Sequence, residues 1–188
     1  MQIHKPTYEE ALSLFKEFNK NESLLKHAYS VEAVMRYVAR KAGEDEEKWG
    51  FIGLVHDLDY ELFPEEHCKK TKEILEERGW PPEYIRAAIS HGWGMYNDEE
   101  PQSYMEKVLY AVDELTGLVS AAALIRPSKS LADLEVKSVM KKWKEKSFAA
   151  GVNRQVIEKG ASMLEVKIKE LVADVIAGMR EVADKIGL

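Results

Sequence analysis

The sequence predicts an all-α fold, and two observations support this prediction. Apolar residues recur at three- and four-residue spacing along almost the whole chain, which is the period of a helix that buries one face. Convincing alternation of apolar and polar residues, the pattern of a half-buried strand, is not found in any segment. We expect one compact helical domain over residues 1–188, with C-terminal helices at about 127–188 packed on a core at about 20–120.

Start and stop signals divide the first two thirds of the chain into six helices. Residues typical of a helix start are Thr7 with Glu10, Asn21 or Ser23, Asp45, Pro64, and Pro81 with Pro82. Gly43 and Gly79 are placed to end the second and the fourth helix. After a polar loop, the sixth and longest helix is expected around residues 103–125.

The breaker Arg126-Pro127-Ser128 begins a more basic C-terminal part. We expect a lysine-rich helix after it, a break near residues 151–153, and then one or two helices that end at Leu188. Apolar residues recur with helical period in this last part, at Val166, Ile168, Leu171, Val175, Ile176 and Met179. They either complete the core or form the interface of a homodimer, since the periodicity fits both.

The composition is that of a globular protein and limits its partners. Hydrophobic residues make up 45% of the chain, charged residues 32%, and the net charge is -6, which argues against a broad nucleic-acid surface. No apolar run approaches the roughly 20 residues of a membrane span, and the N-terminus does not have the pattern of a signal peptide. Because Cys68 is the only cysteine, no internal disulfide can form, and we expect a cytoplasmic protein.

Histidines and aspartates on separate helices carry the strongest functional signal. His27 and Asp113 each interrupt an apolar stripe, where a lone polar residue is more often a hydrogen-bonded core residue than a ligand. His56 and Asp57 are adjacent at the expected end of an apolar helix. Imidazole together with carboxylate suits Mn, Fe, Co, Ni or Zn better than Ca²⁺. We therefore interpret these four residues as a candidate metal site.

The order His27, then His56-Asp57, then Asp113 resembles the H…HD…D signature of the HD-domain superfamily of metal-dependent phosphohydrolases. The resemblance covers roughly residues 20–120. It implies an HD-domain-like helical bundle in which these four side chains bind a first divalent metal, one of Mn, Fe, Co, Ni, Zn and Mg.

The resemblance also implies a role for two histidines that lie between the HD pair and Asp113. In binuclear branches of the superfamily, histidines in the positions of His67 and His91 hold a second metal, with the aspartate of the HD pair bridging the two. His91 ends an apolar run, which favours a buried ligand. His67 lies in a polar turn, where a solvated surface histidine fits equally well. One or two ions per chain are therefore expected.

Residues near the motif are candidates for the remaining chemistry. Asp59 and Glu61 follow the HD pair and are placed to orient a water or to protonate a leaving oxygen. Lys26 precedes the first ligand and either neutralises a phosphate oxygen or extends along the helix surface as an ordinary lysine.

Three further residues are candidates for binding the substrate. Arg126 and Lys129 flank the Pro-Ser break and form either an anion clamp or part of a solvated basic face. Trp93 lies in a glycine-flanked loop and either stacks on a base or plugs the end of a helix.

These features predict hydrolysis of a phosphate ester of a small metabolite, for example a nucleotide, by metal-activated water. Two alternatives stay open. An HD-fold di-iron oxygenase requires that both His67 and His91 bind metal. A non-catalytic nucleotide- or metal-binding sensor module predicts tight binding without turnover.

Overall fold

The computed structural model describes residues 4–188, and its regular structure in this range is helical apart from one isolated bridge between Trp93 and Asn97. The prediction of an all-α fold is confirmed. In chain order the elements are α1 (Tyr8–Phe18), α2 (Glu22–Ala42), α3 (Glu46–Val55), the 3₁₀ turn η1 (Pro64–Glu66), α4 (Lys69–Glu77), α5 (Pro82–Ser90), α6 (Tyr104–Leu124), α7 (Val136–Lys144), α8 (Arg154–Met163), α9 (Ile168–Arg180) and α10 (Ala183–Ile186).

The first helices begin and end at the residues that the sequence indicates. The Thr7 hydroxyl accepts the backbone N–H of Glu10, and the Glu10 carboxylate accepts that of Thr7, so the capping box of α1 is complete. Asn21 and Asp45 accept backbone N–H groups at the starts of α2 and α3. Gly43 ends α2 with φ 76°, a left-handed conformation that glycine adopts without a steric penalty.

Two boundaries differ from the prediction. Pro64 begins the short turn η1 and not a helix that continues to Gly79, because the backbone reverses at Cys68 with φ 68° and α4 starts only at Lys69. In the C-terminal part, three helices follow residues 151–153 where one or two were expected. Glu165, with φ 57°, separates α8 from α9, and a second boundary at Glu181-Val182 separates α9 from the short α10.

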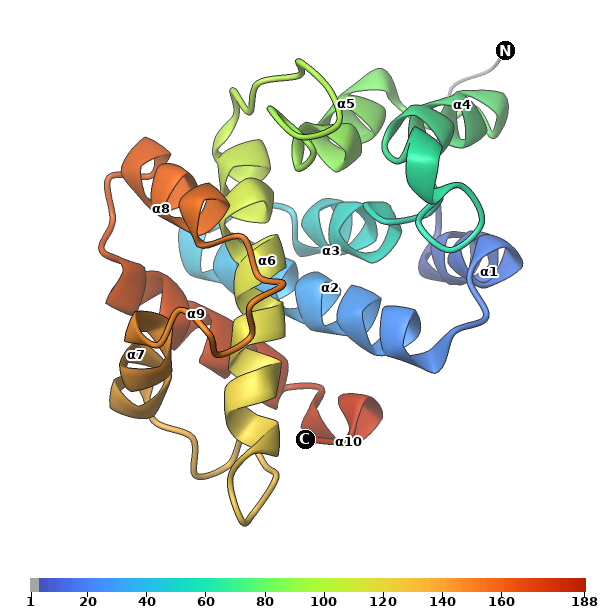
Figure 1. The fold of residues 1–188 in the computed structure, drawn as a ribbon. Helices are drawn as coiled ribbons and strands as arrows, with labels where there is room; N and C mark the ends of the chain where they lie inside the picture. The colour runs from blue at the N-terminus through green and yellow to red at the C-terminus, as the bar shows by residue number, and fades with distance from the viewer. Residues whose placement is uncertain (1–3) are drawn as a thin grey trace.

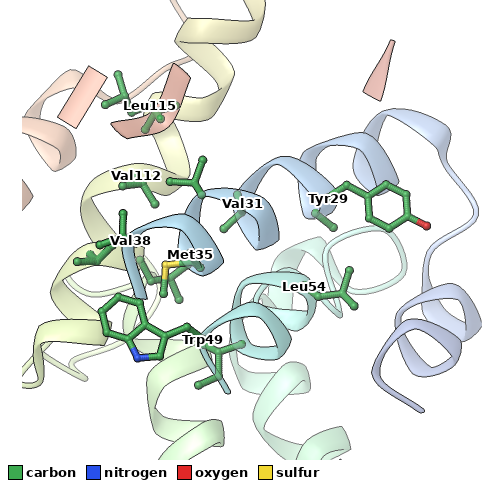
Figure 2. Packing of buried hydrophobic residues seen from close by; sticks show 14 of the residues in the cluster. Tyr29, Val31, Met35, Val38, Trp49, Leu54, Val112 and Leu115 are labelled. Atoms are coloured by element: carbon green, nitrogen blue, oxygen red, sulfur yellow. The ribbon is translucent and has the colours of Figure 1, made fainter. Parts of the chain in front are cut away.

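Helices α2 and α6 cross at the centre of the molecule, with α1, α3, α4 and α5 on one side and α7, α8 and α9 on the other (Figure 1). Figure 2 shows Met35 of α2 between Trp49 of α3 and Val112 of α6. All three side chains are buried. This layer joins the three helices that carry the metal-ligand candidates His27, His56-Asp57 and Asp113.

The C-terminal helices pack directly on the central pair. Helix α9 contacts both α2 and α6, and α8 contacts α6. At the crossing of α9 with α2, a Cβ atom on Gly178 would lie only 2.7 Å from the Cα of Val34, so the close approach requires glycine. Of the six periodic residues, Leu171, Val175, Ile176 and Met179 are buried and belong to the core, whereas Ile168 is half-buried and Val166 is exposed. Among residues 4–188, no helix is both long and apolar enough to cross a membrane.

Candidate metal centre

Four side chains from three helices meet around one point, and we call them the first cluster: His27 of α2, His56 and Asp57 at the end of α3, and Asp113 of α6. Oδ1 of Asp113 lies 3.0 Å from Nε2 of His27 and 3.2 Å from Nε2 of His56. Oδ2 of Asp57 lies 3.5 and 3.4 Å from the same two nitrogens. Ligand atoms held 2.0–2.2 Å from one ion lie about 3.0–3.5 Å apart, so the set fits a single divalent cation.

A second cluster adjoins the first through the same aspartate. Oδ1 of Asp57 lies 3.2 Å from Nε2 of His91 and 3.5 Å from Nε2 of His67. The two histidine nitrogens are 3.1 Å apart. Because the two oxygens of Asp57 face different histidine pairs, the carboxylate is placed to bridge two cations.

Gly53 lets α3 approach α2 closely enough to bring His56 next to His27. A Cβ atom on Gly53 would lie 3.1 Å from the Cα of Glu32 and 3.0 Å from the side chain of Met35, both in α2. Helix α3 ends at Val55, and His56 and Asp57 lie in the turn that directly follows it. The Nε2 atoms of His27 and His56 are 3.3 Å apart as a result.

His67 is buried, with 5% of its surface exposed, and is not a solvated surface histidine. Its Nδ1–H donates to Oδ1 of Asp59 at 2.7 Å, and the other oxygen of Asp59 accepts the backbone N–H of Thr71 at 2.8 Å. Asp59 is itself fully buried. The structure therefore gives Asp59 a positioning role, in which it orients His67 and ties it to α4, and not direct contact with a substrate.

The other three histidines of the clusters also have their Nδ1 atoms engaged. These atoms face the Gly53 carbonyl oxygen (His56, 2.8 Å), the Ala88 carbonyl oxygen (His91, 2.6 Å) and the Thr116 hydroxyl (His27, 3.3 Å). A carbonyl oxygen can only accept, and the Thr116 hydroxyl already donates to the backbone oxygen of Asp113. Each Nδ1 therefore carries the hydrogen, which leaves the Nε2 lone pairs directed into the clusters, as metal ligation requires.

The electrostatics of the site favour a bound cation. Burial lowers the pKa of His27, but the carboxylates of Asp113 and Asp57 outweigh it and raise that pKa to about 10. Burial raises the pKa of Asp113, but the neighbouring histidines outweigh it and hold that pKa below its ordinary value. Without metal, protons on the histidines balance the carboxylates, and a divalent cation can replace these protons.

The clusters open to solvent through a cavity of about 170 Å³. Besides the ligand candidates, its walls are formed by Tyr60, Met95, Tyr96, Glu114, Gly117 and Val152. Tyr60 and Tyr96 are exposed at its rim, with ring centroids 5.1 and 4.6 Å from that of His67. Glu114 is not among the residues predicted from the sequence, although the acidic pair Asp113-Glu114 in an apolar helix was an available signal.

The two remaining catalytic candidates, Glu61 and Lys26, do not line the cavity at the clusters. Oε2 of Glu61 accepts the backbone N–H groups of Lys20 and Asn21 at 2.7 and 2.9 Å, so it secures the start of α2 instead of facing the clusters. Lys26 is exposed and lines a neighbouring cavity of about 490 Å³. That cavity shares His27 and Asp57 with the first one.

The three substrate-binding candidates do not line the cavity at the clusters. Arg126 forms an ion pair of 2.6 Å with Asp133, in the turn after α6, and Lys129 is exposed in the same turn. The Trp93 ring packs near Tyr110, and Nζ of Lys159 lies 3.2 Å from its centroid. Tyr96 and Met95 of the same loop reach the cavity instead.

The comparisons with known proteins give one match. The family model described as the HD domain matches residues 24–118, just over half of the chain. All six metal-ligand candidates of the two clusters fall within this range. Neither the curated proteins nor the solved structures contain a significant match to the chain.

Proposed function

Since this chain belongs to the HD domain family, we propose that it is a metal-dependent phosphohydrolase that cleaves a phosphate ester of a small metabolite, for example a nucleotide. The observation that carries the proposal is the pair of His/Asp clusters that share Asp57. Their ligand atoms have separations suited to divalent cations, and their Nε2 lone pairs point inward.

The donor set fits a divalent metal held by His27, His56, Asp57 and Asp113, with His67 and His91 placed for a second. When bound, such a metal polarises a phosphoryl oxygen and acidifies an adjacent water, which suits attack on phosphorus. The chain's own part is to hold these ligands in fixed orientations through Asp59, Thr116 and backbone carbonyl groups.

The two adjoining cavities suit the two parts of a phosphate ester. The smaller one, of about 170 Å³, borders both clusters and fits a compact phosphoryl group. The larger one, of about 490 Å³, provides Lys26, Ser23 and Ser120 together with the apolar Leu124 for the organic part of the substrate. Exposed Tyr60 lines both cavities, and on this basis we propose that it contacts the substrate where the two parts join.

We assign to Glu114 the role that was predicted for Asp59 and Glu61, which is to orient a water or to protonate a leaving oxygen. It is a carboxylate of the cavity wall that does not belong to either cluster, and one of its oxygens accepts the backbone N–H of Asn153 at 3.0 Å. This contact fixes its position beside the substrate space, where it can orient a water or assist the leaving oxygen.

The experiment is hydrolysis of a panel of phosphate esters with added Mn²⁺, Co²⁺, Ni²⁺ or Mg²⁺. We expect turnover by the wild type and its loss in the double variant His56→Ala, Asp57→Ala. Lys137→Ala, an exposed substitution in α7, is the matched control and should retain full activity. Absence of turnover by the wild type with every ester and metal would overturn the proposal.

The convergence of His67 and His91 on Asp57 favours a second candidate, the di-iron oxygenase, since that chemistry needs two metals. It predicts oxygen consumption by the iron-loaded protein in the presence of an oxidisable substrate. A sensor module predicts saturable binding of a nucleotide to metal-loaded protein, with no release of phosphate over many hours.

A further inference from the structure

Cys68 lies against the second cluster, although the proposed function gives it no role. Its Sγ atom is 3.9 Å from Nε2 of His91, and the side chain is buried with 2% of its surface exposed. Three possible ligand atoms, one each from His67, Cys68 and His91, all lie within 4.8 Å of one another, a grouping suited to a metal ion.

Two features of the backbone place the thiol there. Cys68 has φ 68°, a conformation that is uncommon for residues other than glycine, and it directs His67 and Cys68 into the interior just before α4. On the opposite side, a Cβ atom on Gly92 would lie only 2.5 Å from Sγ of Cys68. Glycine after His91 is therefore what allows the sulfur to approach that histidine.

We propose that Cys68 is a ligand at the second metal position, together with His67, His91 and Oδ1 of Asp57. This inference rests on the metal-binding part of the proposed function. A tetrahedral ion with bonds of about 2.3 Å to sulfur and 2.0–2.1 Å to nitrogen holds these atoms about 3.6 Å apart. The observed 3.9 Å between Sγ and Nε2 of His91 differs from this by about 0.3 Å, which a small side-chain rotation supplies.

The two metal positions then differ in chemistry. The first has two nitrogen and two oxygen ligands, which accept a range of divalent metals, whereas the second adds one sulfur to two nitrogens and one oxygen. A thiolate favours Zn²⁺ and related softer ions over Mn²⁺ and Mg²⁺. On binding, the thiol proton of Cys68 passes to solvent and the sulfur lone pair forms the bond to the metal. The second position is therefore selective for zinc-like ions.

Absorption spectroscopy of the Co²⁺-loaded protein tests the inference without relying on activity. A thiolate bound to Co²⁺ gives an intense sulfur-to-metal charge-transfer band in the near ultraviolet, which histidine and carboxylate ligands do not give. Because Cys68 is the only cysteine of the chain, such a band has one source. We expect the band in the wild type and its loss in Cys68→Ser and Cys68→Ala.

Two ligand variants separate the positions. His91→Ala should abolish the band, whereas Asp113→Ala, which removes a ligand of the first cluster alone, should keep it. Competition titrations should show that Cys68→Ser weakens Zn²⁺ binding at the second position by at least about tenfold, with much less effect on Mn²⁺. Circular dichroism of the metal-free variants checks that each one folds.

Each outcome decides the inference. Two bound Co²⁺ ions without a sulfur band would overturn the role of Cys68 and leave the two-metal site intact. One Co²⁺ per chain, with no sulfur band, would also overturn it, while a one-metal phosphohydrolase would stand. Failure of the wild type to bind any metal would remove the proposed function and this inference together.

Discussion

Oδ1 of Asp57 lies 3.2 Å from Nε2 of His91, while Oδ2 of the same carboxylate faces His27 and His56. The two clusters therefore depend on one residue in the turn that follows α3. Of the other ligand candidates, His27, His56 and Asp113 are assigned to the first cluster, and His67 and His91 to the second. Substitutions can thus separate the contributions of the two positions.

Asp57→Ala should remove metal from both positions, whereas His91→Ala should remove only the second metal. The reason is that Asp57 supplies an oxygen to each cluster. Its loss leaves the first cluster with Asp113 as its only carboxylate and leaves the second cluster with no carboxylate. Elemental analysis after loading and gel filtration measures this, with two ions per chain expected in the wild type. Equal metal loss in the two variants would contradict the bridging role.

Asp59→Asn should weaken the second metal position by about 10- to 100-fold, the usual cost of losing a partner that orients a ligand. The carboxylate of Asp59 accepts Nδ1–H of His67 and also holds the backbone of Thr71, so an amide in its place cannot make both contacts equally well. Metal titration followed by calorimetry measures the change.

Glu61→Gln is the matched control for Asp59→Asn. Glu61 lies two residues away, but its carboxylate accepts only backbone N–H groups at the start of α2 in the contacts described. Its substitution should leave metal affinity unchanged. A loss as large as that of Asp59→Asn would show that the effect comes from the fold around residues 59–61 and not from orientation of His67.

Metal-free protein should lose stability as the pH rises from about 6.5 to about 10. Burial lowers the pKa of His27, but Asp113 and Asp57 outweigh it and raise that pKa from 6.5 to about 10. A raised pKa means that the protonated form stabilises the fold, fully below pH 6.5, and that this contribution is lost as the pH passes through the folded-state pKa.

The stabilisation by added metal should increase as the pH rises, because protons compete with the cation for the same histidine nitrogens. Thermal unfolding measured in chelator and in excess Mn²⁺, across the lower part of this pH range, gives both curves. The difference between the two midpoints should grow with pH. A difference that stays constant or shrinks would argue against a cation that displaces these protons.

Sequence was sufficient where a residue's role follows from its own helix. His27 and Asp113 lie within α2 and α6, and His56 and Asp57 directly follow α3; the apolar faces of these helices are evident in the sequence. The caps at Thr7, Asn21 and Asp45 are local signals. Figure 2 shows buried apolar residues of α2, α3 and α6 packed together. This packing brings the polar interruptions of these helices into contact.

Sequence was insufficient where a role depends on the backbone or on distant neighbours. The position of His67 follows from the left-handed turn at Cys68, which no pattern of residue types indicates. Likewise, Arg126 is engaged by Asp133 and Glu61 by the backbone before α2, and neither partner follows from the helical period. Charged residues near a motif can therefore serve the fold and not the chemistry.

Gly178→Ala tests whether the C-terminal helices belong to the same cooperative unit as the metal centre. The added methyl group would lie 2.7 Å from the Cα of Val34 in α2, and backbone atoms cannot rotate away as a side chain can. Such overpacking costs about 1–3 kcal/mol, against which alanine returns up to about 1 kcal/mol of helix propensity. We therefore expect a lower free energy of unfolding in denaturant. Gly151→Ala, with no atom within 4 Å of its new methyl group, should change the free energy of unfolding by less than about 0.5 kcal/mol.

If one domain spans the chain, the whole unfolding transition shifts together in Gly178→Ala, because α9 packs on α2 and α6, which carry His27 and Asp113. Two transitions, of which only one shifts, would instead show that the C-terminal helices unfold separately from the metal centre.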